Sequence, residues 1–158
     1  MKTTPLFIRI VGGLLLGALI LVSCAMPLYT RGESAAMVAL GHRGKPYIFG
    51  KAGPEGYDCS GLTKVAYATH GIDLIHSAKY IAYDDQYETI ETASAMIPGD
   101  LIFFDTVADS DRYDHVGIWL GMNRFVHASS SEMVIMVSEY DDHWRERFSL
   151  GKRIVNPY

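Results

Sequence analysis

The second half of the chain constrains the fold most strongly, because short apolar or alternating runs follow one another there. Gly, Asn, Asp and Ser residues separate these runs, which is typical of antiparallel strands joined by tight turns. The expected strands follow Pro98-Gly99, in DLIFFD (100–105), HVGIWLG (115–121), NRFVHAS (123–129) and MVIMVSE (133–139). DDHWRERF (141–148) fits a helical turn, and KRIVNPY (152–158) fits a last strand.

The region before Pro98 spaces its apolar residues as helices do. We expect helices at 33–44 and 59–71, each closed by a glycine, and a third at about 77–86. The segment between the first two, 45–57, is rich in Gly and Pro and is predicted to be a loop. Helices followed by strands indicate an α+β domain, with helices packed against an antiparallel sheet. A length of 158 residues with 49% hydrophobic content suits one such domain.

The first 23 residues differ in composition from the rest of the chain. Lys2 and Arg9 carry the only charges before Cys24, and residues 10–22 are almost purely apolar. A cationic start followed by an apolar run of about a dozen residues predicts an export signal over residues 1–23. The run is short for a membrane-spanning helix, which needs ~20 apolar residues.

The end of that segment, Leu21 to Cys24, resembles the bacterial lipobox, whose cysteine is acylated and becomes the mature N-terminus. We therefore expect lipid on Cys24, a tether over 24–31 and a single domain over 32–158. The alternative is an uncleaved anchor with an incidental cysteine.

The chain without its predicted export signal is acidic. Removal of Lys2 and Arg9 from the 14 basic residues leaves 12 against 18 acidic ones, a formal charge of −6. This balance gives no electrostatic basis for binding nucleic acid.

The segment GYDCSG, residues 56–61, places Cys59 at the start of the second predicted helix. Backbone N–H groups at a helix start lack partners and favour an anion, so we expect the thiol pKa to fall below its usual ~8.5. Asp58 is expected to cap the helix, and Gly56 and Gly61 to allow other backbone to approach closely. Cys59 is then a reactive thiol, or, in the alternative interpretation, a small buried hydrophobic residue.

Two histidines lie in the strands of a predicted hairpin. If Trp119 pairs with Asn123 around a three-residue loop at 120–122, His115 lies directly opposite His127. Both imidazoles then project from one face of the sheet, close enough to form a hydrogen bond. With the thiol, they make the arrangement of a nucleophile, a general base and an orienting group.

The histidine pair could also hold a metal ion, but the sequence offers no third ligand at a suitable spacing, so zinc is not expected. We expect neither a metal nor any other cofactor. The other histidines are predicted to lie in loops or on the surface: His42, His70, His76 and His143.

Four motifs in order resemble the NlpC-type papain-like cysteine peptidases of bacterial cell walls. They are PYIFG with DCSG, then PGDLIFF, then DHVGIWLG, then RFVHAS. The resemblance covers roughly residues 44–130 and implies a papain-like fold. It also implies that Cys59 is the nucleophile, His115 the general base and His127 the residue that orients the base.

The resemblance further suggests which residues meet the oxyanion and the substrate. These are Tyr47, Asp58, Ser60 and Ser77. The chain departs from the family pattern at Lys51, where a glycine is usual, and at His76 and Ile81, where arginine and glutamine are usual. These departures leave the nucleophile and both histidines in place and bear on substrate preference.

The family resemblance implies hydrolysis of peptide bonds in peptidoglycan stem peptides. The expected bond is γ-D-glutamyl–meso-diaminopimelate, and the alternative is the D-alanyl–diaminopimelate crosslink. Two other interpretations remain. The chain could be an amidase or acyltransferase with another substrate, or an inactive wall-binding lipoprotein. We expect an exported monomer that is anchored through Cys24, with Ala25 favouring the periplasmic side of the outer membrane.

Overall fold

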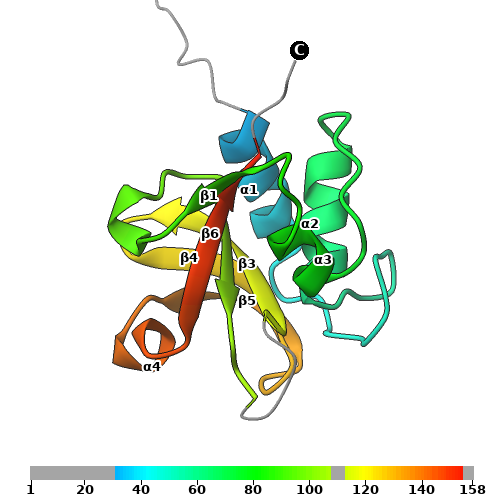
Figure 1. Ribbon diagram of the computed structural model, residues 1–158. Coiled ribbons are helices and arrows are strands. Elements are labelled where there is room, and N and C mark those ends of the chain that lie inside the picture. The colour runs from blue at the N-terminus through cyan, green and yellow to red at the C-terminus, as the bar shows by residue number, and fades with distance from the viewer. Residues whose placement is uncertain (1–30, 108–112, 155–158) are drawn as a thin grey trace, which may run out of the picture.

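The computed structural model describes residues 31–107 and 113–154 (Figure 1). The predicted export signal, Cys24 and all of the predicted tether except Arg31 lie outside these residues. The expected α+β architecture is confirmed, because N-terminal helices pack against a six-stranded antiparallel sheet. Within the described ranges, no helix has the length and apolar content needed to cross a membrane.

The helices agree with the sequence in place but not in length. They are α1 (Arg31–Gly41), α2 (Cys59–Ala68), α3 (Ala78–Ala82) and α4 (Asp142–Arg145), with a 3-10 turn at Ala93–Ala95. α1 ends before the expected Gly44, because the N–H of Gly44 bonds to the Ile135 carbonyl at 2.9 Å in the sheet region. α3 is shorter than predicted because the Asp84 carboxylate accepts the N–H of Gln86 at 3.1 Å, a local bond that competes with helix.

The strands form one sheet in the order β1-β6-β2-β3-β4-β5. Their bounds are β1 (Glu88–Ile90), β2 (Leu101–Phe104), β3 (His115–Gly121), β4 (Arg124–Ser129), β5 (Val134–Glu139) and β6 (Phe148–Arg153). The four expected strands β2 to β5 and the expected turn at α4 are confirmed. β1 was not expected, and β6 begins earlier than predicted and lies between β1 and β2. Residues 155–158 of the predicted last strand lie outside the described residues.

The β3–β4 hairpin has a different register from the one expected. Trp119 pairs with Phe125, not with Asn123. The same register continued along the strands sets His127 opposite Gly117, so the prediction that His127 lies opposite His115 is wrong. The shift is by two residues, and side chains alternate with period two, so both histidines still share one face of the sheet.

The turn explains this shift. Met122 and Asn123 have φ values of 50° and 54°, so the loop is a two-residue turn with both central residues in the left-handed region. Such turns match the twist of paired strands better than the three-residue loop we expected. The extra residue is absorbed by an irregularity between Trp119 and Gly121.

Each face of the sheet carries its own apolar cluster. Helices α1 and α2 cover the face that holds Val116 and Ile118 of β3. The other face holds Phe104, Trp119 and Phe125, with the Trp144 side chain of α4 packed against them. Because residues alternate along β3 and β4, the two histidines belong to this second, aromatic face.

Candidate active site

Cys59 is the first residue of α2, as the sequence predicts. The Asp58 side chain caps the helix by accepting the N–H of Gly61 at 2.6 Å. The backbone N–H of Val116 hydrogen-bonds to the thiol. The sulfur therefore lies where the helix start meets the start of β3, whose first residue is His115.

The glycine at the end of GYDCSG allows the predicted loop 45–57 to press against this helix start. A Cβ on Gly61 would lie 2.1 Å from the carbonyl oxygen of Lys51. In this position the Lys51 carbonyl accepts the N–H of Asp58 at 2.9 Å. The close backbone approach expected for the two flanking glycines is thus confirmed, and a Cβ on Gly56 would likewise lie 2.8 Å from the carbonyl oxygen of Pro46.

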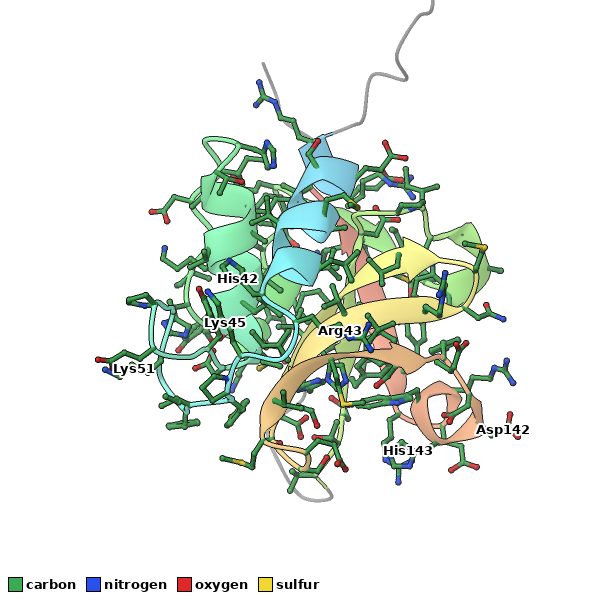
Figure 2. All side chains as sticks on the ribbon, turned by 180° about the vertical axis from the view of Figure 1, so that it is seen from behind. His42, Arg43, Lys45, Lys51, Asp142 and His143 are labelled. Atoms are coloured by element: carbon green, nitrogen blue, oxygen red, sulfur yellow. The ribbon has the colours of Figure 1, made fainter. Side chains whose placement is uncertain are left out.

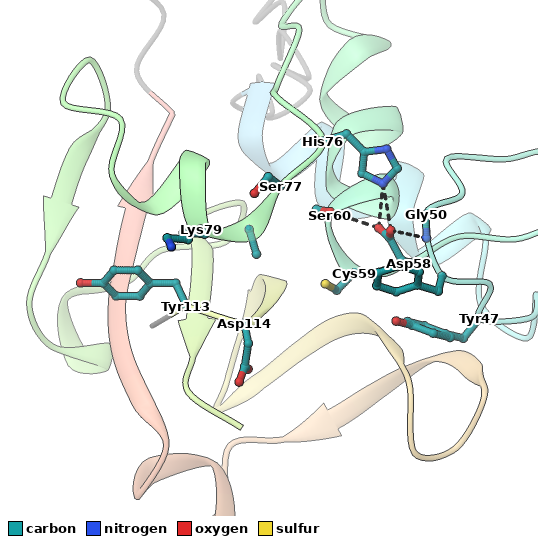
Figure 3. A pocket seen from close by; sticks show the side chains of 12 residues that line it. Tyr47, Gly50, Asp58, Cys59, Ser60, His76, Ser77, Lys79, Tyr113 and Asp114 are labelled. Atoms are coloured by element: carbon teal, nitrogen blue, oxygen red, sulfur yellow. Dashed lines mark hydrogen bonds and ion pairs between the residues drawn. The ribbon is translucent and has the colours of Figure 1, made fainter. Parts of the chain in front are cut away.

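The thiol opens onto a pocket of about 440 Å³ (Figure 3). The walls are the loop 45–57, the start of α2, the segment before α3 and the residues before β3. The pocket contains the predicted nucleophile and every predicted oxyanion or substrate residue: Tyr47, Asp58, Cys59, Ser60 and Ser77. Tyr47 and Cys59 lie close to each other at one side of this pocket (Figure 3). Burial, followed by the charges of Cys59 and Asp58, raises the pKa of Tyr47, so its hydroxyl keeps a proton to donate.

The two histidines form one hydrogen-bonded chain with a serine. His115 Nε2 lies 2.8 Å from His127 Nδ1, and His127 Nε2 lies 2.9 Å from Ser138 Oγ. If Ser138 accepts from His127 Nε2–H, then His127 Nδ1 accepts from His115 Nε2–H. In that arrangement Nδ1 of His115 is unprotonated and can accept a proton.

Aromatic rings enclose the histidine pair. The indole of Trp144 stacks on His115 at a centroid distance of 5.8 Å and meets His127 edge-on at 5.2 Å. Phe104 and Phe125 pack on the same two imidazoles. His115 is 7% exposed and His127 is 2% exposed, so the pair is held in a largely water-free environment.

The pKa of the Cys59 thiol differs from the sequence-based expectation. Burial, and after it the negative charge of Asp58, raises the pKa of Cys59 to about 11. The N–H groups of Val116, Ser60 and Cys59 itself act in the expected direction, but burial outweighs them. The predicted lowering of the thiol pKa is therefore wrong, and at neutral pH the sulfur keeps its proton and needs a base.

Burial has the opposite effect on the imidazoles, because it disfavours their charged form. It lowers the pKa of His115 to about 4, against a smaller raising effect of Asp114. Burial, followed by the proximity of His115, lowers the pKa of His127 to about 3. Both imidazoles are therefore neutral at pH 7, which is the state that a general base requires.

These lowered pKa values predict a loss of stability in acid. Below pH 6.5 the unfolded chain binds protons at His115 and His127 that the folded chain does not bind, so protonation favours unfolding. We expect the free energy of unfolding to decrease as pH falls from about 6.5 to 4, by about 3 kcal/mol for His115 alone. Urea unfolding of the full-length chain at pH 7, 5.5 and 4.5 measures this decrease.

Two variants separate the buried histidines from other acid-sensitive groups. His127→Asn should show a smaller decrease, because one buried imidazole is removed. His143→Gln should show the full decrease, because His143 lies exposed on α4 and points away from the molecule (Figure 2). An equal decrease in all three proteins would attribute the acid sensitivity to carboxylates.

Two side chains of the site were not predicted from the sequence. Ser138 and Trp144 contact the histidine pair from β5 and α4, and neither segment was part of a recognisable motif. His76 lies in the loop before α3, as predicted, and there it lines the pocket and contacts Asp58. In the described parts of the chain, no group of three or more His, Cys, Asp or Glu side chains could hold a metal ion.

Comparison with known proteins places this geometry in a family. The sequence pattern of the NlpC/P60 family matches residues 44–153. The chain belongs to this family. Among solved NlpC/P60 structures, NlpC2 from Trichomonas vaginalis has a TM-score of 0.70 and 27% identity, over 81% of this chain and 47% of that one. A lipoprotein-like NLP/P60 protein from Staphylococcus aureus has a TM-score of 0.65 and 32% identity, over 80% and 42%.

Curated relatives match the same NlpC/P60 region. A probable endopeptidase of Mycobacterium tuberculosis is 36% identical over 112 residues, which are 70% of this chain and 27% of the relative. The murein DD-endopeptidase MepS of Escherichia coli is 32% identical over 72% of this chain and 58% of its own length. The gamma-DL-glutamyl hydrolase of Bacillus subtilis is 33% identical over 72% and 27%. The chain thus spans only about a quarter to somewhat over half of the length of these relatives.

Proposed function

We propose that this chain is a cysteine endopeptidase that hydrolyses peptide bonds in peptidoglycan stem peptides. The observation that carries the proposal is the bond between the Cys59 thiol, at the start of α2, and the N–H of Val116 in β3. Val116 directly follows His115, the first member of the buried chain of His115, His127 and Ser138. The names of the NlpC/P60 relatives supply the substrate class, because they include endopeptidases that act on murein.

The first half of the reaction forms a thioester. Cys59 Sγ attacks the amide carbonyl carbon while its proton passes to Nδ1 of His115. The carbonyl oxygen becomes an oxyanion, for which the Tyr47 hydroxyl and the backbone N–H of Cys59 are the available donors. The C–N bond then breaks, and the proton on His115 goes to the leaving amine. His127 keeps the imidazole of His115 in the tautomer and orientation that these transfers need.

The second half returns the thiol. Water enters in place of the amine, and His115 removes its proton as the oxygen attacks the thioester carbonyl. The C–S bond breaks, the new carboxyl product leaves, and the sulfur regains the proton from His115. Cys59 and water supply every proton that is transferred, so Cys59, His115 and the oxyanion donors are sufficient for a full catalytic cycle.

Two bonds of the stem peptide are candidates. We propose the γ-D-glutamyl–meso-diaminopimelate bond. The support is the names of two Bacillus subtilis relatives, a gamma-DL-glutamyl hydrolase and a bifunctional muramidase/DL-endopeptidase. The Escherichia coli DD-endopeptidases favour the D-alanyl–diaminopimelate crosslink instead, at a similar level of identity. Of the three departures from the family pattern, His76 bears on this choice because it lines the pocket. Lys51 and Ile81 are not among the residues that line it, and Ile81 is buried in the core.

Mass spectrometry of purified muropeptides tests both the activity and the bond. The full-length chain in detergent is incubated with crosslinked and uncrosslinked muropeptides, with Cys59→Ser as the matched control. We expect fragments only with the wild-type protein. The masses of the two fragments from one cut should sum to the mass of the substrate plus one water, and the individual masses identify the bond. Products that join two substrates would indicate acyl transfer, and no fragments from any muropeptide would contradict the proposal.

We also propose that Cys24 carries a lipid that holds the enzyme on the membrane beside its substrate. The support is the sequence LVSC after the apolar run, at residues 21–24. Two or more acyl chains are needed for stable anchoring, which is what acylation at such a site provides. Intact-mass analysis of membrane-extracted protein, with Cys24→Ala beside it, measures the modification directly.

Ser138 should contribute measurably to the rate, because its hydroxyl lies 2.9 Å from Nε2 of His127 and their hydrogen bond selects the tautomer of that imidazole. We expect Ser138→Ala to lower kcat/KM for muropeptide hydrolysis about fivefold, the effect of losing about one hydrogen bond. Ser138→Thr keeps the hydroxyl and should retain most of the rate. Ser130→Ala, exposed just after β4, is the control. Equal rates for Ser138→Ala and the wild type would show that the histidine pair holds its tautomer without the serine.

A further inference from the structure

The carboxylate of Asp58 connects separate segments around the nucleophile. Its Oδ1 accepts the N–H of Gly61 at 2.6 Å and the hydroxyl of Ser60 at 3.1 Å, both at the start of α2. Its Oδ2 accepts the N–H of Gly50 at 2.8 Å, in the loop that carries Tyr47. Asp58 is 7% exposed, so an anion sits nearly buried beside Cys59 and joins the thiol helix to the Tyr47 loop.

A histidine from a third segment completes this set of contacts. His76 precedes α3, and its Nε2 lies 2.9 Å from Oδ1 and 3.0 Å from Oδ2 of Asp58 (Figure 3). A Cβ on Gly61 would lie 3.0 Å from the same nitrogen, so the imidazole packs directly on the helix start. Among the described partners of the carboxylate, His76 is the one whose charge can change.

The charge of Asp58 opposes reaction at the thiol. It raises the pKa of Cys59, second only to burial, because it disfavours negative charge on the sulfur. A cation on Asp58 reduces this repulsion. The contact with His76 also holds the Asp58 carboxylate against the backbone N–H groups of Gly61 and Gly50. These two bonds join the helix of Cys59 to the loop of Tyr47.

We propose that His76 is a positioning residue that acts through Asp58, holding its carboxylate in place and, when protonated, compensating its charge beside Cys59. The inference rests on the proposed function only where muropeptide hydrolysis is measured. The effect of His76 on the reactivity of the Cys59 thiol can be measured without that substrate. Other groups that ionise face this pocket: Lys79 from α3, Tyr113 and Asp114 before β3, Tyr47 from the loop, and Cys59. The described contact of the imidazole is with Asp58, at 2.9 Å.

The test compares His76→Gln, which keeps a hydrogen-bond donor without charge, with His76→Arg, which keeps a permanent cation. Two quantities are measured from pH 5 to 8.5 on the full-length chain in detergent. One is the rate constant for alkylation of Cys59 by iodoacetamide, and the other is kcat/KM for muropeptides. Thermal unfolding of each variant confirms that comparisons are made on folded protein.

We expect His76→Gln to lower both quantities about tenfold at the acid end of the range. The ratio of wild type to His76→Gln should shrink as pH rises, while the ratio of His76→Arg to His76→Gln stays constant. In an Asp58→Asn background, which still caps α2, His76→Gln should have no further effect. A constant ratio of wild type to His76→Gln at every pH, or an undiminished effect in that background, would overturn the proposal.

The two readouts also separate this inference from the proposed function. Alkylation needs no peptidoglycan. If the wild type cuts no muropeptide but its alkylation depends on His76 as described, the substrate is wrong and the role of His76 holds. If muropeptides are cut and neither readout responds to His76, the role of His76 is wrong and the proposed function holds.

Discussion

Replacement of His115 by alanine should lower kcat/KM for muropeptide hydrolysis by about 10³- to 10⁴-fold, the size expected for loss of a general base. The raised pKa of Cys59, about 11, is the physical reason, because a protonated thiol cannot attack without transferring its proton. His127→Ala should cost less, about 10- to 100-fold, because it leaves the base present but free to rotate. Initial rates of fragment release, followed by mass spectrometry, measure both effects.

His143→Gln is the matched control for this series, since it removes an exposed imidazole whose described ring contact is with Trp144 and not with His115 or His127. It should hydrolyse at the wild-type rate. Unfolding in urea at pH 7 confirms that each variant is folded. A His115→Ala protein that is folded and retains wild-type hydrolysis would show that another group removes the thiol proton, and the assignment of His115 as base would have to be abandoned.

The sequence was enough to predict that the two histidines project from the same face of the sheet. It was not enough to predict the register in which their strands pair. Period-two alternation alone puts His115 and His127 on one side of the sheet, and any even shift preserves this. The register depends on the turn, and Met122 in the left-handed region is not a residue type that announces such a turn. The imidazoles therefore meet diagonally across Gly117 instead of directly, and they still approach to 2.8 Å.

The contacts that support the pocket and the histidine pair were not predictable, because residues distant in the sequence make them. His76 is 18 positions from Asp58 in sequence, and only the fold shows that its ring reaches the carboxylate. Trp144 lies in a short helix between β5 and β6, and β6 pairs beside β2 instead of beside its neighbour in sequence. Local sequence patterns do not predict that β6 lies between β1 and β2. They do predict that α2 begins at Cys59.

The thiol pKa shows a similar limit. The helix start that the sequence predicts is real, and its amides do lower the pKa of Cys59. Burial has the larger effect, because other segments of the chain pack around the half-buried Cys59 side chain, which still opens onto the pocket. At neutral pH the protein accordingly holds a neutral thiol and neutral imidazoles, and the reactivity of the thiol depends on how accurately the surrounding segments are placed.

Gly61→Ala adds only one methyl group, but we expect it to lower both the stability and the activity of the protein strongly. The new methyl group would lie 2.1 Å from the carbonyl oxygen of Lys51, an impossible contact with backbone. The loop must move away from α2, which breaks the bond between Asp58 N–H and Lys51 and shifts Tyr47 relative to the thiol. We expect a loss of about 3 kcal/mol in the free energy of unfolding, as for severe overpacking, and about 100-fold in kcat/KM from misplacement of the reacting groups.

Gly41→Ala, at the end of α1, is the matched control, because a Cβ there meets nothing within 4 Å. It should change the free energy of unfolding by less than about 0.5 kcal/mol and leave hydrolysis unchanged. Urea unfolding and muropeptide hydrolysis on the same samples give both numbers for both variants. If Gly61→Ala were as stable and as active as Gly41→Ala, the loop would not need its contact with the helix start, and the glycine of GYDCSG would have no structural role in placing Cys59.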